Sequence, residues 1–186
     1  MASGVDLYWL PLGAGGHCVR LNGRVYEAVA ARRARRARCD LYHAALEVRL
    51  DGERWVIEQA PAWNLRAPDR GVVGEGPVGA RRLGRLKAFR YEVRRWRGGV
   101  IPDRDEAVDS PRRLSADPRR ARRILELVPQ APLATWGRDE HGAGEMWNSN
   151  SLIAWLLVRS GHDVAAIAPP AGGRAPGWSA GIAVAG

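Results

Sequence analysis

The spacing of hydrophobic and polar residues predicts a mixture of strands and helices. The stretch that begins at Asp6 is apolar and aromatic up to Pro11 and then turns through glycines, which indicates a first strand of about five residues. From Val19 to about Arg38, apolar residues recur at helical spacing while arginines occupy the remaining positions. The chain is therefore expected to open with a short strand and an amphipathic helix.

The clearest pattern is a β-hairpin over residues 43–60. Two alternating runs are joined by Asp51-Gly52, a dipeptide strongly favoured in two-residue turns. This turn predicts Leu50 opposite Glu53 and, further along, His43 opposite Ala60. The buried face of the hairpin would then hold Leu46, Val48, Leu50, Trp55 and Ile57. The opposite face would hold His43, Ala45, Glu47, Val56 and Glu58, with Glu58 a diagonal neighbour of His43.

The middle of the chain alternates between loops and regular elements. Residues 60–77 and 102–115 are rich in Pro, Gly and Asp, and we expect both to be loops. Between them, Phe89, Tyr91 and Val93 alternate with charged residues, as in a strand. Asp117 and Pro118 then predict a helix start, followed by an apolar face made of Ile124, Leu125 and Val128.

The segment EMWNSNSLIAWLLVRSG, residues 145–161, places four small polar residues before an apolar helical run. We expect a helix that begins within a residue or two of Ser149, runs to about Ser160 and ends at Gly161. Asn and Ser often cap helices because they accept hydrogen bonds from the free N–H groups of the first turn. One cap would suffice, so the surplus is either a cap with polar neighbours or a nucleophile at a helix N-terminus. Beyond it, residues 163–170 and 181–186 are expected to be short closing strands or loop.

These elements predict an α+β fold, with an antiparallel sheet packed on two or three helices and residues 1–186 forming a single domain. The longest apolar run is too short to span a bilayer. The N-terminus lacks the pattern of a signal peptide, so we expect a cytoplasmic protein. Cys18 and Cys39 fit no metal or disulfide spacing, and no phosphate-binding loop is present, so we expect no metal and no cofactor.

The net charge of +9 is a weak indication of function. All of the basic residues except Lys87 are arginine, as is typical of proteins from GC-rich genomes. The tract from Arg32 to Arg38 fits a solvated helix end, and no nucleic-acid-binding motif accompanies it. We therefore rank a basic nucleic-acid-binding module third among the functional alternatives.

Two segments carry a family resemblance. A histidine in a strand (LYHAALEV) that precedes a polar helix start (WNSNSLIAWLL) resembles the circularly permuted papain-like proteins of the NlpC/P60 and lecithin–retinol acyltransferase-like type. With FRYEVRRWRGGVIPD and GRDEHGAGEMWNSNS, most of the chain is also similar to uncharacterised proteins of high-GC bacteria. One difference affects the chemistry, since Ser149 stands where the permuted enzymes carry cysteine.

The resemblance implies a hydrolase or acyltransferase-like enzyme that acts on an amide, ester or thioester. Ser149 would be the nucleophile, His43 the general base and Glu58 its orienting carboxylate, which is the arrangement of a catalytic triad. The Ser149 amide or Asn148 would bind the oxyanion. Substrate contacts are expected from Asn148, Asn150, Trp147 and Glu47. The alternative, held equally open, is a catalytically silent fold that binds a ligand or partner in the same cleft.

Overall fold

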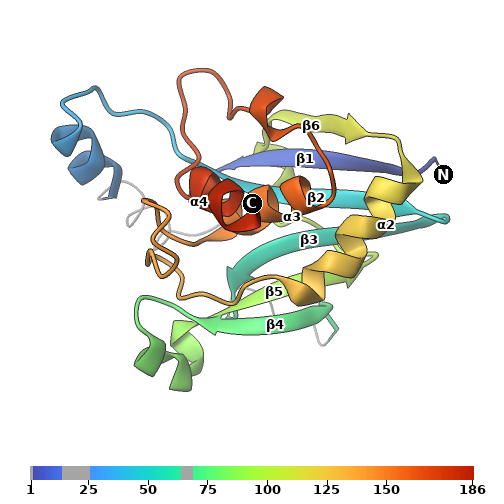
Figure 1. Ribbon diagram of the computed structural model, residues 1–186, viewed down its shortest axis with the longest axis horizontal. Helices are drawn as coiled ribbons and strands as arrows, with labels where there is room; N and C mark the ends of the chain where they lie inside the picture. The colour runs from blue at the N-terminus through green and yellow to red at the C-terminus, as the bar shows by residue number, and fades with distance from the viewer. Residues whose placement is uncertain (1, 14–25, 64–68) are drawn as a thin grey trace.

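A six-stranded antiparallel sheet forms the centre of the molecule, with strand order β4-β5-β3-β2-β1-β6 (Figure 1). The computed structural model describes residues 2–13, 26–63 and 69–186. The strands are β1 (Gly4–Pro11), β2 (Tyr42–Leu50), β3 (Glu53–Pro61), β4 (Val72–Pro77), β5 (Arg90–Arg97) and β6 (Val108–Ser115). The expected α+β class with an antiparallel sheet is confirmed.

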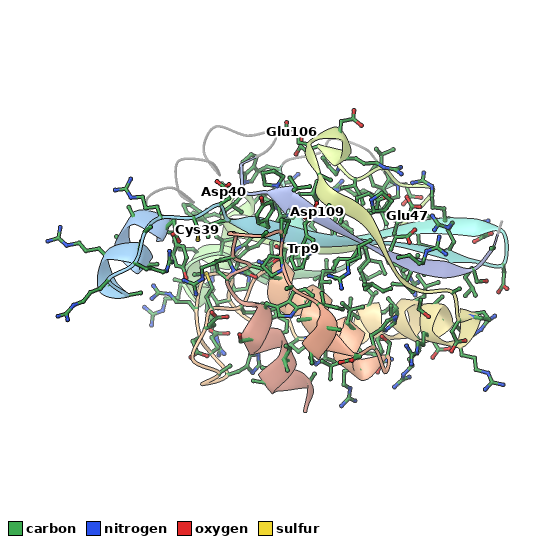
Figure 2. The ribbon with its side chains drawn as sticks, turned by 90° about the horizontal axis from the view of Figure 1, so that it is seen from above. Trp9, Cys39, Asp40, Glu47, Glu106 and Asp109 are labelled. Carbon is green, nitrogen blue, oxygen red and sulfur yellow. The ribbon has the colours of Figure 1, made fainter. Side chains whose placement is uncertain are left out.

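Three helices cover one face of this sheet: α2 (Pro118–Leu127), α3 (Ser149–Arg159) and α4 (Trp178–Ala185) (Figures 1 and 2). Residues 26–33 form a further helix at the end of the sheet where β2 begins. Short 3₁₀ segments complete the fold, namely η1 (Arg81–Arg85), η2 (Lys87–Phe89), η3 (Arg104–Glu106), η4 (Val128–Gln130) and η5 (Val164–Ala166). In the part of the chain that the structure describes, no helix is long and apolar enough to cross a membrane.

The main core lies between the helices and the sheet, and the hairpin pattern explains how the sheet contributes to it. Leu50 pairs with Glu53, as the two-residue turn requires, and Leu46, Val48 and Ile57 are fully buried against the helices. Trp55 lies on the same side but is only partly buried, at the edge of this core.

Both predicted helix starts are confirmed, and α4 then packs closely on α3. Asp117 precedes α2, and its carboxylate accepts a hydrogen bond from the backbone N–H of Arg119 in the first turn. Asn148 caps α3 in the same way. The close approach of α4 requires a glycine, because a Cβ at Gly181 would lie 2.2 Å from the Ser151 carbonyl oxygen.

One part of the predicted hairpin register is wrong. Pairing between β2 and β3 ends at Leu46–Ile57, so His43 does not lie opposite Ala60. Beyond that point β2 continues along β1, where His43 pairs with Leu10, whereas β3 continues along β5. The two central strands therefore part towards one end of the sheet, and the N-terminus of α3 lies beside β2 there.

Several expected loops are regular elements. β4 and β6, placed within the predicted loops at 60–77 and 102–115, form the two edges of the sheet, where Pro and Gly are tolerated because one side of the strand needs no partner. In the closing segments predicted as strand or loop, residues 181–185 belong to α4, which begins at Trp178, and residues 164–166 form η5. In the predicted helix of residues 19–38, residues 26–33 are helical, while residues 19–25 lie outside the described residues, as does Cys18.

Candidate functional site

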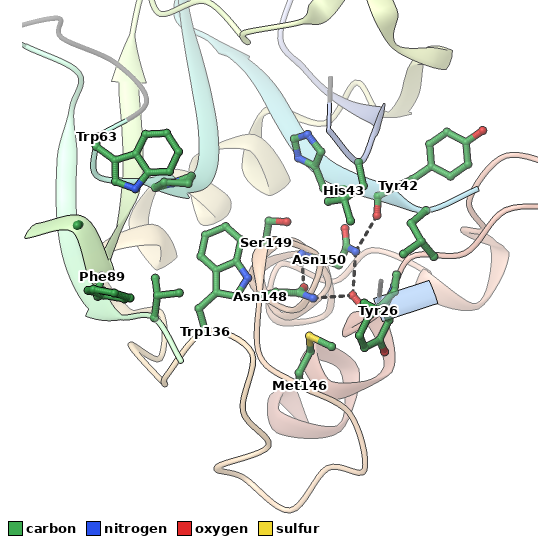
Figure 3. Close-up of a pocket in the computed structure, with 16 residues that line it drawn as sticks. Tyr26, Tyr42, His43, Trp63, Phe89, Trp136, Met146, Asn148, Ser149 and Asn150 are labelled. Carbon is green, nitrogen blue, oxygen red and sulfur yellow. Dashed lines mark hydrogen bonds between the residues drawn. The ribbon is translucent and has the colours of Figure 1, made fainter. Parts of the chain in front are cut away.

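The gap between the parted strands contains a pocket of about 410 Å³ (Figure 3). Its walls come from the start of β2, the end of β3, η2, the helix at 26–33, the segment before α3 and the N-terminus of α3. The lining is mostly apolar and aromatic: Leu12, Tyr26, Leu41, Tyr42, Pro61, Trp63, Val78, Ala88, Phe89, Trp136, Met146 and Pro176. The polar members are His43, Asn148, Ser149 and Asn150.

Two of the four polar residues at the start of α3 form a capping box. The side-chain oxygen of Asn148 accepts hydrogen bonds from the N–H groups of Asn150 (2.9 Å) and Ser151 (3.3 Å). In return the Ser151 hydroxyl oxygen accepts the Asn148 N–H at 3.1 Å. The same hydroxyl donates to the Gly177 carbonyl at 2.7 Å. Asn148 and Ser151 therefore satisfy the first turn of the helix and attach it to the chain ahead of α4.

Asn150 holds the helix against the parted end of β2. Its side-chain amide donates to the carbonyl oxygens of Tyr42 (3.0 Å) and Pro176 (2.8 Å). The Pro176 carbonyl also accepts the Asn148 side-chain amide at 2.9 Å. Asn150 is 2% exposed, and its side-chain oxygen has no hydrogen-bond partner among the described residues. Asn150 is thus mainly structural but leaves one buried acceptor at the pocket.

Ser149 differs from its three neighbours. It is the first residue of α3, it lines the pocket, and neither its hydroxyl nor its backbone N–H bonds to any described residue. The residue is only 4% exposed, and it is one of the residues that line the pocket. Helix N-termini attract negative charge and lone pairs through such free N–H groups. Ser149 is therefore the residue of this segment whose hydroxyl and backbone N–H are both free to bind a molecule in the pocket.

His43 lines the same pocket, where burial lowers its pKa to about 4. The imidazole is consequently neutral at pH 7, with one nitrogen able to donate a hydrogen bond and the other able to accept one. His43 makes no side-chain hydrogen bond to Ser149 or to any other residue that the structure describes. His43 and Ser149, the predicted base and nucleophile, therefore line the same pocket, but no hydrogen bond connects them.

Glu58 does not orient His43, contrary to the prediction. Its carboxylate binds the Arg94 guanidinium of β5 at 2.8 Å, and Arg94 is fully buried. Desolvation raises the pKa of Glu58, and the charge of Arg94 opposes this effect. The register explains the error, because the diagonal relation with His43 is lost where β2 and β3 part. The Ser-His-Glu arrangement is therefore not assembled in the described residues.

Two predicted substrate contacts also lie elsewhere. Glu47 is buried on the other face of the sheet, where it forms ion pairs with Arg49 (2.5 Å), Arg54 (3.4 Å) and Arg104 (3.7 Å). Trp147 is 1% exposed and packs in the core, with the His141 ring 5.5 Å from its own. Neither residue lines the pocket.

Sequence reasoning missed the aromatic lining. Tyr26, Trp63 and Phe89 come from three distant segments, and they are 40%, 53% and 41% exposed. Their only signal in the sequence is that each is a large aromatic residue beside a turn or a charged run. Over the described ranges, no group of three or more His, Cys, Asp or Glu side chains is placed to hold a metal ion.

The chain matches no protein-family model, no curated protein sequence and no solved structure. The resemblance to permuted papain-like proteins therefore stays a prediction. A function has to be inferred from the pocket itself.

Proposed function

We propose that the protein binds a small molecule in this pocket. The observation that carries the proposal is the pairing of an apolar, aromatic lining with the unbonded Ser149 hydroxyl at its inner side. Ligand sites are typically concave and apolar, with a few polar groups that fix orientation, and volumes of about 300–1,000 Å³ are common for them. The pocket of about 410 Å³ has these properties.

The polar groups indicate what kind of ligand would fit. Among the residues described, no Asp, Glu, Lys or Arg lines the pocket, and the lowered pKa leaves His43 uncharged at pH 7. A charged ligand group would lose its hydration without gaining a counter-ion there. A neutral carbonyl, amide or ester can instead accept from the Ser149 hydroxyl and from a free N–H. The favoured ligand is therefore uncharged, with an aromatic or branched aliphatic body and one carbonyl-type group.

A thermal-shift screen of neutral aromatic amides, esters and ketones tests this proposal. A ligand at about 100 times its Kd stabilises the native state by about 2.7 kcal/mol. For a chain of this length, that corresponds to a rise in Tm of about 5–10 °C. Ala88→Trp adds a large side chain at the pocket wall and should abolish the shift. Ala166→Trp is the matched control, because Ala166 is exposed on η5 and does not line the pocket. Equal shifts in both variants would place the binding elsewhere.

A second candidate is a hydrolase or acyltransferase-like activity in which Ser149 attacks the bound carbonyl. The specific observation in its favour is that Ser149 and His43 line one pocket with the serine at a helix N-terminus. His43 would accept the serine proton through a bridging water, because no hydrogen bond joins the two residues and on β2 His43 alternates with Tyr42 and Ala44, which pack towards the helices. The free N–H groups would stabilise the oxyanion. Glu58 has no part in this version, because its carboxylate is bound to Arg94.

Covalent labelling by a fluorophosphonate distinguishes binding from catalysis. Activity predicts a single adduct on Ser149 that disappears in Ser149→Ala and is strongly reduced in His43→Ala. Because the pKa of His43 is about 4, the labelling rate should fall only as the pH drops to about 4, where the base becomes protonated, and not near the ordinary value of 6.5. A folded protein that binds ligands but acquires no adduct would support the binding function alone.

A further inference from the structure

Two projections lie at the same end of the sheet (Figure 1), and both contribute side chains to the lining of the pocket. The first projection consists of residues 26–38, the helix and the arginine-rich turn that follows it. The second consists of residues 81–89, formed by η1 and η2 beside the edge strand β4. Tyr26 of the first and Phe89 of the second both line the pocket, so the two projections share its rim.

Both projections expose large apolar side chains. None of the residues of η1 or η2 is buried, and Leu83, Leu86 and Phe89 are 37%, 57% and 41% exposed. On the other projection Val29 is 47% exposed, and Trp63 lies on the rim with 53% exposed. Clustered exposed apolar residues on a soluble domain typically mark a surface that binds something. Here Trp63 and Phe89 also line the pocket, and Leu86 directly precedes η2, which contributes Ala88 and Phe89 to that lining.

Cations surround these apolar side chains. The exposed basic residues of the projections that have no acidic partner among the described residues are Arg32, Arg33, Arg35, Arg38, Arg82, Arg85 and Lys87. The other cations nearby are neutralised, since Arg36 binds Glu27 and Arg81 binds Glu140. Asp40 is an exposed acid in the same region. The two projections therefore carry a clear excess of positive charge.

We propose that this end of the molecule docks on the surface of an anionic lipid bilayer. Basic side chains bind acidic headgroups, and neighbouring apolar side chains enter the boundary between headgroups and acyl chains. Outside the pocket lining, the large exposed apolar residues of the projections are aliphatic, namely Val29, Leu83 and Leu86. They favour a bilayer over a nucleic acid, because bases stack on aromatic rings and gain little from leucine or valine. The pocket mouth would then face the bilayer. This docking goes beyond the ligand-binding function and does not depend on it.

Co-sedimentation with vesicles tests the proposal on the full chain. The protein should bind vesicles of phosphatidylcholine with phosphatidylserine, bind vesicles of phosphatidylcholine alone much more weakly, and be released by salt. The triple variant Arg82→Glu, Arg85→Glu, Lys87→Glu should bind at least about tenfold more weakly, since each basic residue near an anionic surface adds to the affinity. The matched control Arg119→Glu, Arg120→Glu, Arg123→Glu makes the same change in net charge on α2, away from the projections, and should bind like wild type.

A second variant tests the apolar part without altering the charge. Leu83→Ser with Leu86→Ser should weaken vesicle binding severalfold while the Tm stays unchanged, because neither leucine is buried. The proposal would be overturned if the charge variants of the projection and of α2 lost vesicle affinity equally. It would also be overturned if the double serine variant bound vesicles as tightly as the wild type. Binding to a single-stranded oligonucleotide with no binding to vesicles would assign the surface to nucleic acid instead. Ligand-induced thermal shifts are measured without vesicles, so failure of docking and failure of the pocket are distinguishable.

Discussion

Ser149 and Ser151 offer a matched pair of substitutions, because both are buried serines in the first turn of α3. Ser151 is 0% exposed, and its hydroxyl bonds to the Asn148 N–H and the Gly177 carbonyl. Ser149 is 4% exposed, and its hydroxyl bonds to no described residue. Replacing each by alanine removes one oxygen atom from the same turn. The two changes should nevertheless have different effects on stability.

The magnitude follows from the bonds that are lost. Ser151→Ala leaves the buried Asn148 N–H without a partner, which costs about 1–3 kcal/mol, while the Gly177 carbonyl keeps its hydrogen bond from the Gly181 N–H. The loss of the capping box is part of the same cost, so we expect about 1–3 kcal/mol in total. Ser149→Ala breaks no bond and places a better helix former in the first turn, so its effect should stay within about 0.5 kcal/mol.

Urea unfolding at pH 7, followed by circular dichroism, measures both changes. The midpoint should fall clearly for Ser151→Ala and stay near wild type for Ser149→Ala, with the same m-value in all three proteins. A loss for Ser149→Ala as large as that for Ser151→Ala would mean that the Ser149 hydroxyl has a structural partner. In that case the serine would be part of the cap, and its availability to a ligand would be refuted.

The remaining predictions concern His43, the Arg94 ion pair and the α3–α4 contact. The folded-state pKa of His43, about 4, lies below the ordinary 6.5, so the unfolded chain protonates first. The free energy of unfolding should therefore decrease as the pH falls from about 6.5 towards 4, and His43→Gln should lessen that decrease in urea melts at several pH values. Arg94→Met leaves Glu58 buried without its cation and should cost about 3–5 kcal/mol in the same melts. Glu58→Gln should leave the ligand affinity and any labelling of Ser149 at the wild-type level. A large loss of either would show that Glu58 takes part in binding or catalysis. Gly181→Ala puts a methyl group against the Ser151 carbonyl and should lower the free energy of unfolding by about 1–3 kcal/mol, whereas no change would show that α4 shifts freely.

Elements specified by local signals could be predicted from the sequence. The turn at Asp51-Gly52 and the cap at Asn148 depend on residues a few positions apart, and both are where the pattern places them. The apolar positions on the helix-facing side of the hairpin were predicted for the same reason, since burial on one face imposes a regular period. Helix α3 lacks such a period, because residues 149–157 are all buried. Edge strands such as β4 and β6 lack that period, because one side of the strand forms no ladder and the sequence tolerates Pro and Gly there.

The site depended on contacts between distant residues. The separation of β2 from β3 accompanies the docking of Asn150 on the Tyr42 carbonyl, two residues that are 108 positions apart. Glu58 was assigned to His43 because only the hairpin was considered, and its partner Arg94 lies on a strand 36 residues away. The position of Ser149 was predictable from its helix, but its freedom from hydrogen bonds became visible only in the folded chain.

The most direct test of ligand binding uses the tryptophan indole N–H signals in a two-dimensional NMR titration with a neutral aromatic amide or ester. Trp63 and Trp136 line the pocket, whereas Trp55 and Trp155 do not. Binding in the pocket predicts that the Trp63 and Trp136 indole signals and the Ser149 amide signal move together with one dissociation constant. The indole signals of Trp55 and Trp155 should stay in place. Signals that move only at Trp55 or Trp155, or a titration of the whole set of neutral ligands that moves none of the pocket signals, would contradict the proposed function.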